Sequence, residues 1–72
     1  MYTAVFHRLA EGGFYATVRE MPEVQTEGET LREAGENLAD ALGLVLADKL
    51  AEQLSQIQER KIVDHLEVTF PK

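Results

Sequence analysis

The sequence predicts a single small α+β domain over residues 1–72, with its elements in the order βββαβ. Alternating apolar and polar residues on both sides of a glycine pair predict two antiparallel strands near the amino end. A capping box followed by apolar residues at helical spacing predicts one long helix, and a second alternating run predicts a strand near the carboxyl end. We therefore expect an antiparallel-dominated sheet with the helix on one face.

The first two strands are predicted at residues 2–8 and 14–19, where apolar and polar side chains alternate. Gly12 and Gly13 between them can take positive φ, which suits a hairpin loop of about three to five residues. Pro22 ends the second strand because it has no N–H for the ladder. Residues 24–26 then form a short third strand.

The helix is predicted to begin at Leu31, because Thr30 and Glu33 have the spacing of a capping box. Gly35 and Gly43 each cost about 1 kcal/mol relative to alanine in a helix, so we expect both to be points of close contact with the sheet. The residues predicted to share the face toward the sheet are Leu31, Ala34, Leu38, Ala41, Leu42 and Val45.

Beyond Val45 the apolar stripe rotates, because steps of four residues advance about 400° around a helix. Either the helix bends or breaks near residues 47–50, or its second half faces another subunit. The second reading is favoured, since a helix of about 28 residues spans about 42 Å and a strand of seven residues only about 23 Å. The predicted oligomer contact consists of Leu46, Leu50, Leu54 and Ile57.

A fourth strand is predicted where Leu66, Val68 and Phe70 alternate with polar residues, and Pro71 closes it. We expect this strand to join the sheet beside the first or the third strand.

Composition indicates a chain that gains stability from a partner. A domain of 72 residues buries only about 60% of its unfolded surface, and the sequence has no cysteine for a disulfide, so we expect a homo-oligomer. No apolar run approaches the roughly 18 residues of a membrane span, and the amino end has no signal pattern. We expect no membrane association and a cytoplasmic location.

The charge is strongly acidic, with a formal net charge of −6 from 13 acidic and 7 basic residues. Such a chain repels a phosphate backbone, so direct nucleic-acid binding is disfavoured and a small basic protein is the expected partner. An alternative stays open, in which the carboxylates only keep a surface solvated and complement the start of the helix. The residues predicted to bind the partner are Glu20, Glu23, Glu27 and Glu29, with the adjoining helix start.

The sequence offers little chemistry, so we expect no enzymatic activity, no cofactor and no metal. His7 and His65 have no third ligand at a recognisable spacing. A two-metal nuclease site of the ribonuclease H kind needs converging carboxylates, yet the first strand contains no acid. Glu36 and Asp40 form only an i, i+4 pair on the expected solvent side of the helix.

The order of these motifs resembles the amino-terminal, partial ribonuclease H-like domain of HicB-family antitoxins. The resemblance covers residues 2–46. The matching positions are Tyr2, Gly12, Gly13, Phe14, Pro22, Gly28, Thr30, Glu33, Ala34, Asn37, Ala41 and Leu42.

The resemblance implies a non-enzymatic binding module that covers the active site of a small basic, mRNA-cleaving HicA-like toxin. Two departures from the family pattern matter. Arg19 and Glu23 stand where a Pro-x-x-Pro-Gly pattern has its first proline and its glycine, so we expect a differently shaped loop there. The chain ends at Lys72 without the DNA-binding domain that family antitoxins commonly carry, so we do not expect autoregulation through DNA. The alternatives are a stand-alone homo-oligomeric binding domain and, third, a divalent-metal-dependent nuclease.

Overall fold

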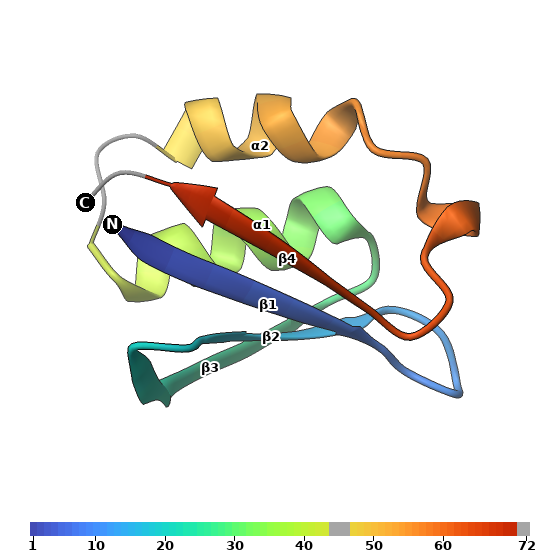
Figure 1. Cartoon of the computed structure of the whole chain (residues 1–72), viewed down its shortest axis with the longest axis horizontal. Coiled ribbons are helices and arrows are strands. Elements are labelled where there is room, and N and C mark those ends of the chain that lie inside the picture. Colours follow the sequence, from blue (N-terminus) through green and yellow to red (C-terminus); the bar gives the residue numbers. More distant parts are fainter. Residues whose placement is uncertain (44–46, 71–72) are drawn as a thin grey trace.

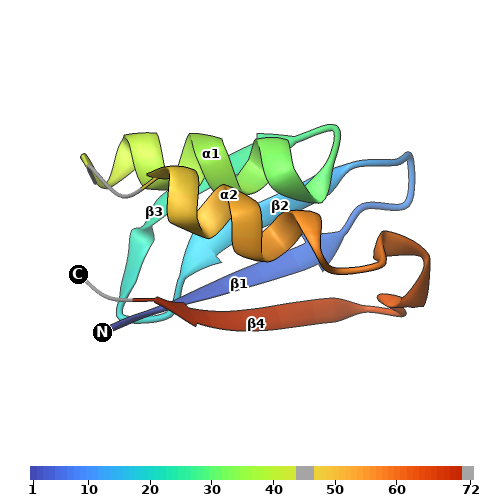
Figure 2. The ribbon, with the colours of Figure 1, turned by 90° about the horizontal axis from the view of Figure 1, so that it is seen from above.

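The computed structural model describes residues 1–43 and 47–70, and it confirms the predicted α+β class. One antiparallel sheet forms one layer and two helices form the other, both on the same face of the sheet (Figures 1 and 2). The elements in chain order are β1 (Tyr2–Arg8), β2 (Phe14–Val18), β3 (Met21–Gly28), α1 (Leu31–Ala41), α2 (Ala47–Ser55), the short 3₁₀ helix η1 (Glu59–Lys61) and β4 (His65–Phe70).

The strands lie in the order β3-β2-β1-β4, and every neighbouring pair is antiparallel. The fourth strand therefore joins beside the first, one of the two positions expected. Phe6 lies opposite Ala16 on one side and opposite Leu66 on the other, so these three side chains share the face under the helices. The sequence alternation correctly gave the inward-facing residues of β1, β2 and β4.

The β1–β2 connection closes as a short loop on glycine. The Leu9 amide donates to the Gly13 carbonyl at 3.0 Å, and the Gly12 amide donates to the Leu9 carbonyl at 3.1 Å. Gly12 and Gly13 have φ of 105° and 85°, a region that side chains with a Cβ rarely adopt. Positive φ at this glycine pair was predicted and is confirmed.

The third strand is longer than predicted, since it runs from Met21 to Gly28 instead of residues 24–26. Proline is tolerated at Pro22 because β3 is an edge strand, where only one side of the backbone needs partners. The register shifts between Thr17 and Val18, so that Val18 lies opposite Met21. This irregularity lets the short β2–β3 turn close without a longer loop.

Helix α1 begins as the capping box predicts. The Thr30 hydroxyl accepts a hydrogen bond from the Glu33 amide at 3.0 Å, while the Glu33 carboxylate accepts from the Glu29 amide, one residue before the expected partner. The buried face partly differs from the prediction because α2 covers the side that carries Gly35 and Ala39, whereas Ala41 is exposed. Val45 lies outside the described residues.

The helical region is broken into two helices, because α1 ends at Ala41 and α2 begins at Ala47. Gly43 has a φ of +68° and its amide donates to the Asp40 carbonyl at 3.0 Å, which is a glycine C-terminal cap. Chain direction reverses, and α2 runs back alongside α1 (Figures 1 and 2). The expected contact of Gly43 with the sheet is therefore wrong, and so is that of Gly35, which packs against Leu54 of α2. The alternative of a break is confirmed, ahead of residue 47.

The reversal also removes the reason for a subunit contact on the second half of the helix. Leu50 and Leu54 are only 3% and 1% exposed within this single chain, so their prediction as an oligomer contact is wrong. Ile57 is partly buried against the same core, and Leu46 lies outside the described residues. Self-association as such stays a prediction.

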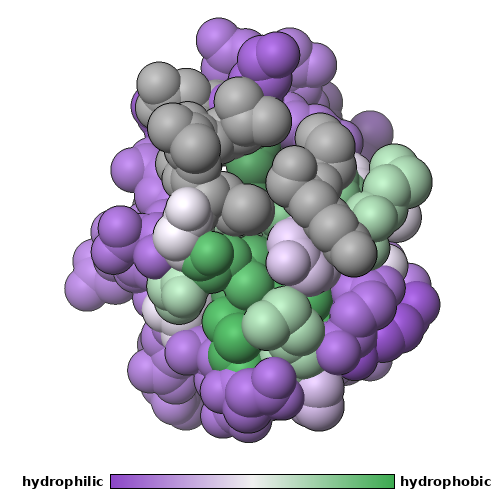
Figure 3. All heavy atoms as spheres, turned by 90° about the vertical axis from the view of Figure 1, so that its left-hand side faces the viewer, coloured by the Kyte–Doolittle hydropathy of each residue, from purple (hydrophilic) through white to green (hydrophobic). Residues whose placement is uncertain are grey.

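The core lies between the sheet and the two helices. Its largest fully buried side chains are Phe6, Phe14, Val18, Leu31, Leu38 and Leu54. Figure 3 views the molecule from the end where the chain begins, and apolar side chains gather in the middle of this face with polar ones around them.

Within the described residues, no helix is both long and apolar enough to cross a membrane.

Candidate functional site

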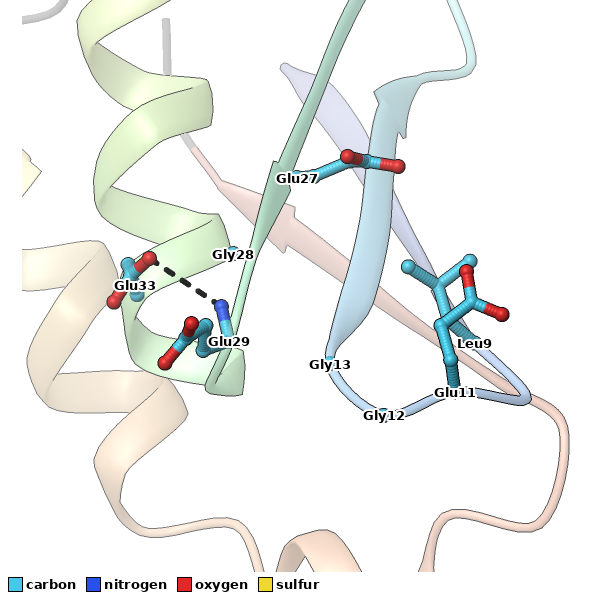
Figure 4. A pocket seen from close by; sticks show the side chains of 8 residues that line it. All are labelled: Leu9, Glu11, Gly12, Gly13, Glu27, Gly28, Glu29 and Glu33. Atoms are coloured by element: carbon cyan, nitrogen blue, oxygen red, sulfur yellow. Dashed lines mark hydrogen bonds between the residues drawn. The ribbon is translucent and has the colours of Figure 1, made fainter.

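A cleft opens between the β1–β2 hairpin loop and the start of α1 (Figure 4). Its volume is about 560 Å³. Three segments that are distant in the sequence form it: the hairpin loop, the end of β3 and the first turn of α1. The lining residues are Leu9, Glu11, Gly12, Gly13, Glu27, Gly28, Glu29 and Glu33.

Two glycines bring these segments together. A Cβ on Gly28 would lie 2.3 Å from the Ala34 backbone nitrogen, so only glycine lets α1 start this close to the end of β3. A Cβ on Gly13 would lie 2.8 Å from the Gly28 carbonyl oxygen, so the hairpin loop can also approach only without a side chain. The cleft floor is thus largely backbone, and its walls carry the side chains.

Carboxylates line the walls of this cleft. Glu11 comes from the hairpin loop, Glu29 precedes α1, and Glu33 lies in its first turn. Glu27 comes from β3 opposite Tyr15, so its side chain points to the face of the sheet opposite the helices (Figure 4). No lysine or arginine is among the lining residues, and no ion pair involving these four glutamates is present in the described part of the chain. We call Glu11, Glu27, Glu29 and Glu33, with the half-buried Leu9, the acidic cleft.

Only two of the four glutamates predicted to bind a partner lie in the acidic cleft. Glu27 and Glu29 line it, whereas Glu20 precedes β3 and Glu23 lies near its first residue, at the far end of the strand. Glu23 lies four residues before Glu27, about 13 Å along the strand at about 3.3 Å per residue. Glu20 and Glu23 therefore lie outside the acidic cleft.

Glu20 instead forms hydrogen bonds within the fold. One of its carboxylate oxygens accepts from the Thr3 amide at 2.7 Å and the other from the Thr3 hydroxyl at 2.8 Å. The backbone hydrogen bond from Thr3, followed by the one from its hydroxyl, lowers the pKa of Glu20 below its ordinary value of 4.5. This carboxylate ties the β2–β3 turn to β1.

Glu11 was not predicted to belong to this site, because the sequence showed it only as the residue before the glycine pair. Glu33 was predicted as the capping-box residue and as part of the acidic helix start beside the expected binding segment. The register that lays Phe14 opposite Gly28 is what brings the hairpin loop to the helix start. That register depends on the bulge near Val18, for which the sequence has no clear signal.

The segment after α2 is hydrogen-bonded to the start of α1 and to Arg8 of β1. The Glu59 carboxylate accepts from the Leu31 amide at 3.3 Å, so it fills the amino end of α1 together with Thr30. Arg8 donates through Nε to the Ile62 carbonyl at 2.8 Å and through Nη2 to the Glu59 carbonyl. The same guanidinium lies over the Phe14 ring, 5.0 Å from its centroid.

The two histidines meet on the open face of the sheet. His7 and His65 are directly opposite each other on β1 and β4, and their rings stack with centroids 5.9 Å apart. Tyr15 lies on the other side of His7 at 6.0 Å, and Asp64 and Glu67 lie beside His65. No group of three or more His, Asp or Glu residues in residues 1–43 and 47–70 could hold a metal ion.

The carboxylates considered for nuclease chemistry lie on the solvent side of α1. Glu36 pairs with Arg32 at 2.9 Å, and Asp40 is exposed. Neither residue lines the acidic cleft. The described residues thus bring no acids from β1 and α1 together.

Comparison with known proteins gives two matches. The model of a family described as UPF0150-like matches residues 1–57. The UPF0150 protein ssl0738 of Synechocystis sp. is 30% identical over 60 residues, which cover 83% of each chain. No solved structure gives a significant match.

Proposed function

This chain belongs to the UPF0150-like family, and from its acidic cleft we propose that it is a non-enzymatic, HicB-like antitoxin domain. In this role it neutralises a small basic, mRNA-cleaving HicA-like toxin in the cytoplasm by covering the toxin's active site. The observation that carries the proposal is a cleft with four carboxylates and no lysine or arginine. The order of motifs shared with HicB antitoxins supports the same role.

The acidic cleft is suited to a cationic side chain. An arginine or lysine of the partner would enter between the hairpin loop and α1, where the Glu11 carboxylate on one side and those of Glu29 and Glu33 on the other can accept its hydrogen bonds. Leu9 offers apolar contact for the stem of such a side chain. Because the whole chain carries a net charge of −6, encounter with a basic partner is steered and becomes slower in salt.

A stand-alone homo-oligomeric binding domain is the second candidate. The small size of the chain favours it, because a domain of this length gains stability by burying surface in an assembly. Nuclease activity ranks below both, since Glu36 and Asp40 lie away from the acidic cleft. We propose no enzymatic role for this chain.

The test is binding to the small basic protein encoded next to this chain, purified as a catalytically inactive toxin. We expect a complex by isothermal titration calorimetry, and a loss of about tenfold or more in affinity for the double variant Glu27→Gln/Glu29→Gln, as for charged groups that bond directly to a cation. Glu23→Gln/Glu52→Gln is the matched control, which removes the same charge from exposed positions outside the cleft.

Two results would count against the proposal. One is the absence of any small basic protein encoded beside this chain. The other is an affinity that the two double variants reduce equally, because net charge alone would then explain the effect. Labelled RNA incubated with this chain and Mg²⁺ or Mn²⁺ tests the nuclease alternative directly. We expect no metal-dependent cleavage. Cleavage that Asp40→Asn abolishes would favour the nuclease instead.

A further inference from the structure

The two edges of the sheet differ in how they are protected. On β3, Pro22 has no N–H, and its carbonyl accepts from the Gln25 side chain at 3.1 Å. The Glu27 carbonyl accepts from the Asn37 side chain of α1 at 2.8 Å. Charged residues, proline and covering side chains are the usual means by which proteins block strand addition. The β3 edge is therefore closed to a further strand.

Of these devices, residues 65–70 of the β4 edge carry only the charged Glu67, which pairs with Arg19 of the same chain. The strand contains neither proline nor glycine, and β1 is its only neighbour among the described strands. The Arg8 amide donates to the Asp64 carbonyl at 3.0 Å, which fixes the side that faces β1. Because backbone groups alternate along a strand, the N–H and C=O groups of His65, Glu67 and Thr69 point away from the sheet. No described segment lies beyond this edge (Figure 2).

We propose that β4 pairs antiparallel with β4 of a second copy of this chain, around a twofold axis at Val68. An antiparallel strand edge is complementary to itself, so a second copy fits it without any further change. The result is a continuous eight-stranded sheet with all helices on one face. This proposal is independent of toxin binding, because the acidic cleft lies at the hairpin loop and α1 and stays open.

The side chains select the register. A twofold at Glu67 would place two Glu67 carboxylates directly opposite each other, which is unfavourable. A twofold at Leu66 would place Asp64 opposite Val68 of the second copy, a charge beside an apolar side chain. Both registers follow from the side-chain alternation of β4, and both are disfavoured.

The register at Val68 places apolar side chains opposite each other and brings no two like charges together. Leu66 lies opposite Phe70 of the second copy on the helix side, and Glu67 lies opposite Thr69 of the second copy on the open side. Leu66 is half-buried in the single chain, so the partner strand would cover the rest of it. The Glu67 and Thr69 pairs then exchange the backbone hydrogen bonds of the new ladder.

The experiment is sedimentation equilibrium on the full chain and on two variants at one position. Thr69→Glu places a carboxylate opposite Glu67 of the second copy twice per dimer, so we expect dissociation about tenfold stronger. Thr69→Lys places a cation there, so we expect a dimer at least as tight as that of the unchanged chain. Gln25→Glu and Gln25→Lys on the closed β3 edge are the controls, and neither should change the dimer.

Amide hydrogen exchange gives a second measurement that needs no variant. In a monomer the Glu67 and Thr69 amides exchange fast and the Leu66 and Val68 amides slowly. In the dimer, protection of Glu67 and Thr69 rises with protein concentration. A chain that stays monomeric to about 0.5 mM, far above the micromolar range of specific complexes, overturns the proposal. So does a dimer in which Thr69→Glu and Thr69→Lys behave alike.

Discussion

Gly35 of α1 faces Leu54 of α2 so closely that a Cβ on Gly35 would lie 2.1 Å from the Leu54 Cδ1. In an isolated helix, Gly→Ala gains about 1 kcal/mol. Here Leu54 is 1% exposed, and overpacking of a core costs about 1–3 kcal/mol. We predict that Gly35→Ala lowers the free energy of unfolding by about 1 kcal/mol, measured by urea denaturation.

A double-mutant cycle isolates this contact. Leu54→Ala alone should cost about 2–5 kcal/mol, because it leaves a cavity between the helices. With Leu54 truncated, the alanine at position 35 has room and its helix propensity should make it stabilising. If Gly35→Ala has the same effect in both backgrounds, the close contact does not explain why the helix carries a glycine.

Gly28 makes a stricter demand, since a Cβ there meets backbone. The nearest atom is the Ala34 nitrogen at 2.3 Å, and no rotamer change can relieve that clash. We predict that Gly28→Ala costs about 3 kcal/mol or more, at the upper end of overpacking, and disturbs the acidic cleft. Thermal unfolding followed by circular dichroism measures it.

Gly12→Ala is the comparison for this variant. Gly12 has a φ of 105°, but its Cβ would meet nothing within 4 Å. Its cost should therefore be only the backbone strain, about 1–2 kcal/mol. A Gly28→Ala variant that is no less stable than Gly12→Ala would show that α1 can move away from β3 at little cost.

The part of the fold that the sequence predicts is the part set by local patterns. Alternation located three of the four strands, and Thr30 located the start of α1 because a cap is decided within four residues. The break between the helices was harder to place, since the rotating stripe fits either a second subunit or a second helix folding back. Gly43 indicates the end of α1, because glycine is a common C-terminal cap. In the sequence, however, this glycine was interpreted as a point of close packing against the sheet.

The acidic cleft depends on a contact that no local pattern fixes. Glu27 and Glu29 were identified from charge alone, and they line the cleft. Glu11 joins them only because the register of β2 and β3 brings the hairpin loop beside α1. Glu20 was grouped with them by proximity in sequence, although both its oxygens bond to Thr3. The register between β2 and β3 is set by the packing of the whole folded chain, so the charge pattern of the sequence does not predict it.

Arg8 joins the sheet to the segment that supports the start of α1. Its guanidinium donates to the carbonyls of Glu59 and Ile62 and lies over Phe14. We predict that Arg8→Met keeps most of the apolar stem but loses these hydrogen bonds, at about 1–2 kcal/mol. Arg32→Met is the control, because it loses only a surface pair with Glu36 worth about 0.3–0.5 kcal/mol. Equal costs for the two variants would mean that the Arg8 bonds add nothing beyond a surface contact.

The bonds between Glu20 and Thr3 make stability depend on pH in a defined direction. The folded state holds the pKa of Glu20 below the ordinary value of 4.5, because the amide and hydroxyl of Thr3 donate to the ionised carboxylate. The stabilisation is therefore fully present above about pH 4.5 and is lost as the pH falls through the lowered pKa. Glu20→Gln removes the titrating group while keeping one acceptor oxygen.

We predict that Glu20→Gln lowers the melting temperature near pH 7, and that the difference from the unchanged chain shrinks as the pH falls below about 4.5. Glu23→Gln controls for the loss of one negative charge, since it removes an exposed carboxylate from the same end of β3 without removing the bonds to Thr3. Thermal unfolding at several pH values between about 2.5 and 7 measures the effect. The melting-temperature difference could also stay constant across this range. The charge on Glu20 would then not hold the β2–β3 turn to β1, because an ionised carboxylate loses its stronger hydrogen bonds when it is protonated.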